Sequence, residues 1–171
     1  RDRFVNAAPP SAIALQAKGP AYVRLAASAA TVGDTWSSAG GEQPKFCTYA
    51  HTAQGACHVL VKFTVADDVP VNNPVTERWR DLLLAEHLAL ETLAAGGVSA
   101  AYSRVLDVGT QRFLELERFD RVGALGRHAL LSLAALDGAF VGNAIAPWPV
   151  VTAELARQKT ITAQAHAAAT L

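Results

Sequence analysis

The sequence has no methionine, only two cysteines and no long hydrophobic run. No apolar stretch approaches the roughly 20 residues that a membrane-spanning helix needs, and the N-terminal residues RDRFVNAAPP lack the apolar core of a signal peptide. We therefore expect a cytoplasmic protein without a membrane partner. The missing initiator methionine and an Ala-rich end (ITAQAHAAATL) without a helix-ending signal predict an internal fragment of a longer protein.

Neither sign of charge is in excess, because 15 Lys and Arg residues balance 15 Asp and Glu residues. A chain without a basic footprint does not attract nucleic acid by charge, so we expect no direct nucleic-acid binding. Hydrophobic residues make up 51% of the composition, which indicates a globular chain rather than a disordered one. Its 171 residues are enough for one domain or for two small lobes.

Motifs for metal or hydrolase chemistry are missing as well. The histidines are scattered along the chain: His51, His58, His87, His128 and His166. Their spacing is not typical of a metal site, and no serine has the G-x-S-x-G setting of a hydrolase nucleophile. The two cysteines, Cys47 and Cys57, flank the turn HTAQGA, so they could face each other across a hairpin. Two reduced thiols are the simpler interpretation.

Strand and helix signals alternate along the chain. A Pro-containing lead and a helix near residues 20–32 make residues 1–35 an N-terminal helical or linker segment. The runs KFCTYA and CHVLVKF, which are rich in aromatic and β-branched residues, predict a hairpin. A second pair of strand-like runs, YSRVLDV and QRFLELERF, is joined at Gly109-Thr110.

The clearest helix signal, TERWRDLLLAEHLALETLAAGG, lies between the two strand pairs. Thr76 is the predicted N-cap of this helix, and Gly96 or Gly97 is predicted to end it. After FDRVGALGR the composition turns helical and Ala/Leu-rich to the end. This order predicts an α+β fold, with a β-rich lobe over residues 36–121 and a separate helical part over residues 122–171.

One carboxylate falls inside the apolar stripe of the predicted helix. The stripe recurs at helical spacing and predicts the buried face: Trp79, Leu82, Leu83, Leu90 and Leu93. Arg78, Arg80 and Asp81 are expected nearer the polar side. Glu86 lies four residues after Leu82, within the stripe, where a carboxylate is costly unless it is paired. Glu86 therefore either reaches water at the edge of the stripe or pairs with a lysine of the packed sheet.

Lys62 is the candidate partner, because it ends the run HVLVKF and shares a strand face with Leu60. A strand lysine paired with a glutamate of the next helix is the arrangement that protein kinases use. There the lysine holds the α- and β-phosphates of ATP, and the glutamate orients the lysine. From spacing alone, an exposed strand lysine without such a role is the alternative.

The charged run ELERFDR, residues 115–121, follows in the last strand-like segment. A charged run that closes a strand is usually a solvated edge, and the pattern alone favours a structural ion pair between Asp120 and Arg118 or Arg121. At a junction between two lobes, the backbone of this run would also be placed to hydrogen-bond the edge of a purine.

Five segments, taken together and in this order, resemble the HipA-type kinase family: SSAGGEQPKF, VLVKF, NNPVTERWRDLLLAEHLAL, ELERFDR and LSLAALDGAFVG. Members of this family are bacterial serine/threonine kinases that act as toxins in toxin–antitoxin pairs. The resemblance covers roughly residues 36–142. It is closer to the HipA-like proteins with a GEQPKF word than to the best-known toxin.

The resemblance implies a kinase-like N-lobe, an antiparallel sheet with one main helix, followed by the first helices of an α-helical C-lobe. The implied ATP-binding positions lie in a Gly-rich loop, a lysine strand and a hinge: Gly40, Gly41, Glu42, Gln43, Pro44, Lys45, Lys62, Glu117, Arg118 and Phe119. Glu86 is implied to orient Lys62. Ser38, or alternatively Ser37, matches a serine whose autophosphorylation expels the loop and inactivates the kinase.

ATP and Mg²⁺ are the cofactors that the resemblance implies for the full-length parent, and an antitoxin protein is the implied partner. The catalytic loop and the metal-binding aspartate of the family lie downstream, and this chain has no aspartate after Asp137. We therefore expect the fragment by itself to be inactive. The alternative function is a non-catalytic HipA-like scaffold that binds a partner protein.

Overall fold

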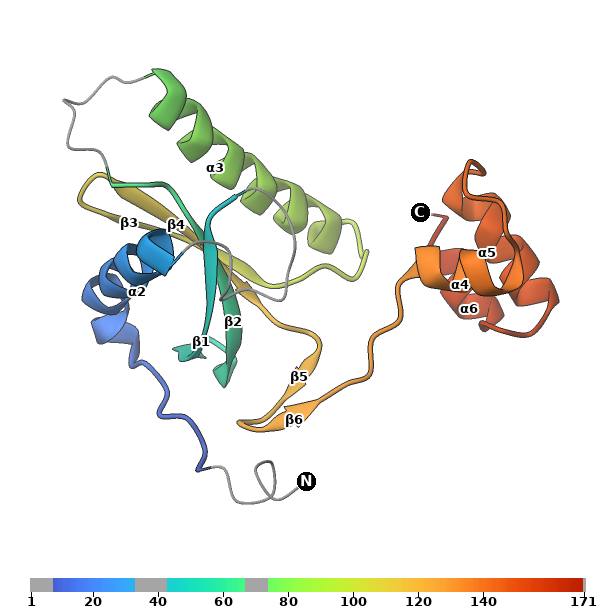
Figure 1. Ribbon diagram of the computed structural model, residues 1–171, viewed down its shortest axis with the longest axis horizontal. Coiled ribbons are helices and arrows are strands. Elements are labelled where there is room, and N and C mark those ends of the chain that lie inside the picture. Colours follow the sequence, from blue (N-terminus) through green and yellow to red (C-terminus); the bar gives the residue numbers. More distant parts are fainter. Residues whose placement is uncertain (1–7, 33–42, 67–73, 171) are drawn as a thin grey trace. The chain divides into compact units, whose positions relative to one another are not determined.

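The computed structural model describes residues 8–32, 43–66 and 74–170, and it divides into two compact units, residues 1–128 and residues 129–171. The first unit is built around a four-stranded antiparallel sheet of strand order β1-β2-β4-β3. Its strands are β1 (Lys45–Thr52), β2 (Gly55–Phe63), β3 (Ser103–Val108) and β4 (Gln111–Glu117). Figure 1 shows two helices against this sheet, α2 (Lys18–Val32) and α3 (Pro74–Ala95). The fold is therefore α+β and consistent with the kinase-like N-lobe that the sequence predicts.

Both predicted hairpins are present, and short turns set their register. In the first hairpin Thr52 pairs with Gly55 across a two-residue turn, and the hydroxyl of Thr52 accepts a hydrogen bond from the backbone of Gln54 at 3.1 Å. Gly55 has a φ of +117°, which a residue with a side chain rarely adopts. In the second hairpin Val108 pairs with Gln111, and Gly109 adopts a φ of +60°. These registers decide which strand residues face each helix.

The sheet face toward α2 is the larger apolar core. Tyr22 of α2 packs edge-on against Phe46 with ring centroids 5.5 Å apart, and Phe63 and Phe113 continue the aromatic layer. A short 3-10 helix, Leu15–Ala17, leads into α2, and Ile13 forms an isolated bridge to β1. The segment near residues 20–32 is therefore helical, as predicted, and it covers one side of the sheet.

The second helix, α3, covers the opposite face and begins at Pro74, two residues before the predicted start. Thr76 therefore lies inside the first turn, and the prediction that it caps the helix is wrong. Proline suits the first turn because its missing N–H would have had no helical partner there. The predicted end is confirmed: the helix ends at Ala95, Gly97 has a φ of +78°, and the backbone N–H of Val98 donates to the carbonyl of Leu93 at 2.9 Å.

The buried face of α3 differs from the predicted apolar stripe. Leu83 is fully buried against Leu114 and Leu116. The predicted core positions Trp79, Leu82 and Leu93 are instead 41%, 47% and 45% exposed, and Arg80, expected on the polar side, is largely buried. The physical reason is that the sheet offers α3 a narrow apolar strip flanked by polar side chains, so polar residues of the helix meet polar residues of the strands.

The remainder of the first unit is a two-stranded ribbon that the sequence pattern did not predict. It pairs β5 (Arg121–Val122) with β6 (Gly126–Arg127), and the carbonyl of Ala124 in its loop accepts a hydrogen bond from Nε2 of His58 at 2.8 Å. Strands of two residues are too short to show a period of two. The first unit therefore extends to His128.

The second unit is helical, as the Ala/Leu-rich composition predicts. It contains α4 (Leu133–Phe140), α5 (Trp148–Arg157) and α6 (Ala163–Ala168). Val151, Thr152 and Leu155 of α5 are buried, and the hydroxyl of Thr152 lies 2.9 Å from Nδ1 of His166 in α6. Among the residues that the structure describes, no helix combines the length and the apolar character needed to cross a bilayer.

Candidate functional site

The ion pair predicted between Lys62 and Glu86 is present in the structure. Lys62 points from β2 toward α3, and its Nζ lies 2.7 Å from each of the two carboxylate oxygens of Glu86. The side chains keep 21% and 34% of their surface exposed. Both alternatives predicted for Glu86 therefore hold in part: it lies at the partly exposed flank of the buried face, and it pairs with a lysine of the sheet.

A second lysine stands beside this pair. Lys45 is the cross-strand partner of Lys62 in the β1–β2 hairpin, and directly opposed residues of an antiparallel pair share a face. Both ammonium-bearing side chains therefore belong to the sheet face toward α3. The arrangement favours an anion on this face, because Glu86 takes only two of the three donors that a lysine ammonium carries.

The predicted Gly-rich loop leads into this face, and only its last residues are described. Ser37, Ser38, Gly40, Gly41 and Glu42 lie outside the described residues. Gln43 and Pro44 directly precede β1, and the carbonyl of Pro44 accepts a hydrogen bond from the backbone of Phe63 at 3.2 Å. This bond places the end of the loop beside the last residues of β2, next to Lys62.

The predicted hinge begins where β4 ends. The backbone N–H of Arg118 donates to the carbonyl of His58, and the N–H of Glu117 donates to the carbonyl of Tyr102, both at 2.9 Å. Phe119 is 76% exposed and forms no backbone hydrogen bond with the described residues. The next backbone groups available for a ligand edge are therefore those of Phe119.

The side chain of Arg118 has a structural partner, as the pattern alone favours. Its guanidinium donates to both carboxylate oxygens of Asp120 at 2.7 and 2.6 Å, and Arg121 donates to the same carboxylate at 3.1 Å. The two arginines hold the pKa of the buried Asp120 carboxyl at about 2, below its ordinary value of 3.8. The same hydrogen bonds raise the pKa of Arg118.

The two cysteines do not face each other, so the hairpin-facing arrangement is wrong. Cys57 is the cross-strand partner of Ala50, three residues from Cys47, and residues an odd number apart on a strand point to opposite faces. Both thiols are free. Cys47 lies on the Lys62 face, where its Sγ accepts a hydrogen bond from the guanidinium of Arg118 at 3.1 Å.

A second lysine–glutamate pair on the other face was missed by the sequence analysis. Lys18 of α2 contacts both carboxylate oxygens of Glu115 at 2.7 and 2.6 Å, and the hydroxyl of Tyr22 donates a short hydrogen bond to the same group. Burial and the adjacent carboxylate raise the pKa of Tyr22 well above its usual value. Glu115 was expected on a solvated edge, yet it is 1% exposed. The sequence signal for this pair was the spacing of four between Lys18, Tyr22 and Ala26, which places all three on the same, buried face of the helix.

The next question is whether the described side chains could hold a metal ion. Within residues 8–32, 43–66 and 74–170, no group of three or more His, Cys, Asp or Glu side chains is placed to hold a metal ion. The described residues therefore do not fit a protein-held Mg²⁺ site.

Comparison with known proteins supports the resemblance carried by the motifs. A family model described as HipA-like C-terminal domain matches residues 37–166. The chain is also 42% identical over 166 residues to Toxin YjjJ of Escherichia coli (strain K12), an alignment that covers 96% of this chain and 36% of the relative. The chain thus spans about a third of the length of that relative. No solved structure matches the chain.

Proposed function

Because the chain belongs to the HipA-like C-terminal domain family, we propose that it carries the nucleotide-binding lobe of an ATP-dependent serine/threonine protein kinase. The parent protein would transfer the γ-phosphoryl group of ATP to a serine or threonine of a protein substrate. The observation that carries this proposal is the Lys62–Glu86 ion pair between β2 and α3.

The exposure of this pair supports a role in binding rather than in stability. Ion pairs that remain in contact with water contribute only about 0.2–1 kcal/mol to folding. A lysine whose ammonium group is oriented by two contacts to Glu86 keeps its third donor for a phosphate oxygen. This is the role of the corresponding pair in protein kinases, where it must be in place for activity.

The end of β4 supports a place for the adenine ring. The backbone N–H of Arg118 is bonded to β2, so the neighbouring residues direct their backbone groups the other way. We assign the carbonyl of Glu117 and the N–H of Phe119 to the adenine edge. The side chain of Arg118 is held by Asp120, so it contributes to this hinge by fixing the backbone rather than by contacting the nucleotide.

Phosphoryl transfer needs further groups, a base that orients the hydroxyl and an acid that holds Mg²⁺. This chain has no aspartate after Asp137. We therefore propose that the chain alone binds nucleotide without transferring phosphate. The relative named a toxin suggests that the parent acts as a toxin with an antitoxin protein as its partner. Phosphorylation at Ser38 or Ser37 would repel the phosphates of ATP and act as an inhibitory switch.

The test is a calorimetric titration of the full-length protein with ATP and Mg²⁺. We expect Lys62→Met and Glu86→Gln each to weaken binding by about 10-fold or more, since a hydrogen bond to a charged group contributes about 1.5–3 kcal/mol. Lys159→Met, which removes an exposed lysine in the second unit, should bind as the wild type does. Equal affinity of wild type and Lys62→Met would remove Lys62 from the nucleotide site. Absence of any binding would favour the non-catalytic scaffold.

A further inference from the structure

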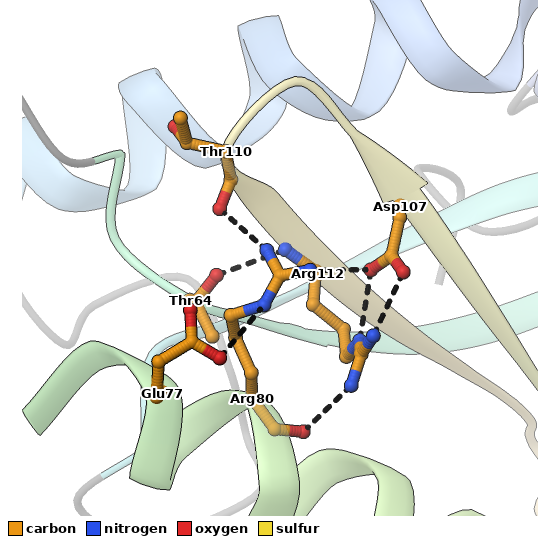
Figure 2. A network of polar contacts seen from close by, with 6 residues as sticks. All are labelled: Thr64, Glu77, Arg80, Asp107, Thr110 and Arg112. Atoms are coloured by element: carbon orange, nitrogen blue, oxygen red, sulfur yellow. Dashed lines mark hydrogen bonds and ion pairs between the residues drawn. The ribbon is translucent and has the colours of Figure 1, made fainter. Parts of the chain in front are cut away.

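A network of polar contacts joins the N-terminal half of α3 to the β3–β4 hairpin (Figure 2). Arg80 donates to the backbone carbonyl of Thr110 at 2.8 Å, and its guanidinium lies 3.6 Å from the carboxylate of Asp107. Glu77, one turn earlier on the helix, lies 3.8 Å from Arg80. A side chain of the helix is thus attached to the turn of a hairpin.

Arg112 completes the network from the strand side. Its guanidinium donates to both oxygens of Asp107 at 2.8 Å, and it also donates to the backbone carbonyl of Arg80 at 3.3 Å. Its backbone N–H is bonded to the hydroxyl of Thr64, just after β2. The hydrogen bonds from Arg112 lower the pKa of the Asp107 carboxyl, and Asp107 forms ion pairs with both arginines.

The contacts of Arg80 and Glu86 lie on opposite sides of the buried face of α3. Arg80 and Glu86 lie three residues before and three residues after Leu83, the one fully buried side chain of the described part of α3. With 3.6 residues per turn, the two charged residues project at about 60° to either side of Leu83. Leu83 packs over β4, one of the two central strands, while Glu86 reaches β2 on one side and Arg80 reaches the β3–β4 turn on the other.

The apolar contacts of α3 do little to fix its rotation about its own axis, because Leu83 is the one fully buried side chain among its described residues and Leu90 is only partly buried on the same cluster. Trp79, Leu82 and Leu93 are exposed, so they add little to the packing against the sheet. The rotation of α3 therefore depends on its polar attachments: Arg80 and Glu86 on the two sides of Leu83, and His87, whose Nδ1 lies 2.8 Å from the hydroxyl of Ser103. A rotation that withdraws Glu86 from Lys62 would also have to break or strain the contacts of Arg80.

We propose that Arg80 and Asp107, supported by Arg112, are positioning residues that hold Glu86 against Lys62. None of the three contacts the Lys62–Glu86 pair, so they act through the orientation of α3. The expected effect on nucleotide affinity rests on the proposed function. The claim that these residues hold the Lys62–Glu86 ion pair in place does not depend on nucleotide binding.

The first experiment reads the ion pair without nucleotide. The rate at which an amine-reactive acylating reagent modifies Lys62 is measured by peptide mass spectrometry in the full-length protein. The contact with Glu86 restrains the ammonium group of Lys62 and shields it from the reagent, so its loss should speed modification by about 3–10-fold in Arg80→Leu and in Asp107→Asn. Glu86→Gln gives the upper limit. Arg78→Leu, which removes an exposed cation from the same helix, should leave the rate unchanged.

Two variants protect the test against a folding failure, because Asp107 is 44% exposed and its replacement by Asn keeps its shape. Unchanged Lys62 modification in both folded variants would overturn the positioning role. A merely structural role would lower the unfolding temperature without changing the Lys62 rate in the folded protein.

The second experiment separates this inference from the proposed function. If both hold, Arg80→Leu weakens ATP binding in the wild type but has little further effect in Glu86→Gln, because the same contact is already lost. Faster Lys62 modification with unchanged ATP affinity would confirm the positioning role and contradict the nucleotide role of the pair. Additive losses of affinity in the double variant would contradict the positioning role.

Discussion

The two faces of the four-stranded sheet each carry a lysine–glutamate ion pair of nearly the same length. On the α2 face Lys18 and Glu115 are 2.6 Å apart, with side chains 1% and 2% exposed. On the α3 face Lys62 and Glu86 are 2.7 Å apart, with side chains 21% and 34% exposed. The chemistry is the same, and only the access of water differs.

This difference separates a structural pair from a pair that is suited to a ligand. Two buried charges need each other, since removing one partner leaves an uncompensated charge in a medium of low dielectric. The third donor of Lys18 and the hydroxyl of Tyr22 have no access to a ligand there, because both residues are buried. Lys62 keeps access to solvent, so an incoming anion can reach it without unfolding the lobe.

The largest expected effect lies on the buried side. Lys18→Met should lower the free energy of unfolding by about 3–5 kcal/mol, since it leaves the Glu115 carboxylate buried without its cation. Urea denaturation followed by circular dichroism measures the change. In a double variant, Lys18→Met with Glu115→Leu, part of the loss should return, because no isolated charge remains. A single variant within about 1 kcal/mol of wild type would contradict the structural role of this pair.

A medium effect should distinguish two neighbouring leucines of α3. Leu83→Ala removes a fully buried side chain and should cost about 2–4 kcal/mol of stability, whereas Leu82→Ala, at a position 47% exposed, should cost less than about 1 kcal/mol. The same denaturation measurement applies to both variants. Equal losses would show that Leu82, as the apolar stripe predicted from the sequence requires, packs on the sheet as Leu83 does.

The smallest stability effect is expected for the exposed pair. Lys62→Met should change the free energy of unfolding by less than about 1 kcal/mol, because a partly exposed ion pair contributes little to folding. The same variant should lose most of its ATP affinity. Lys18→Met is therefore expected to cause the larger loss of stability, and Lys62→Met a loss of ATP binding with little loss of stability. A loss of stability as large as that of Lys18→Met would remove the contrast between the two faces.

Local patterns in the sequence predicted the hairpins, the main helix and the Lys62–Glu86 contact. These features depend on residues close together in the chain or on neighbouring elements, and the anomaly of a carboxylate in an apolar stripe signalled its partner. The sequence pattern placed the start of α3 two residues late, because Thr76 is a preferred N-cap residue, whereas the helix begins at Pro74.

The orientation of α3 and the buried pair could not be predicted in the same way. Leu82 and Leu83 are equally apolar, and the choice between them depends on the polar side chains that the strands present to the helix. Lys18 and Glu115 are separated by 97 residues, so neither shows its partner in a local window. A glutamate in a charged run reads as solvated unless the helix that covers it is known.

The two-residue turn between Thr52 and Gly55 restricts how this lobe can vary in evolution. Because strand side chains alternate between faces, a single residue inserted within β2 would move Lys62 from the α3 side to the aromatic core on the α2 side. Substitutions in the turn are tolerable as long as Gly55 keeps its positive φ, whereas a shift of one residue between the turn and Lys62 would be incompatible with the site. We therefore expect lineages of this lobe to differ in the residues of the hairpin while conserving its length.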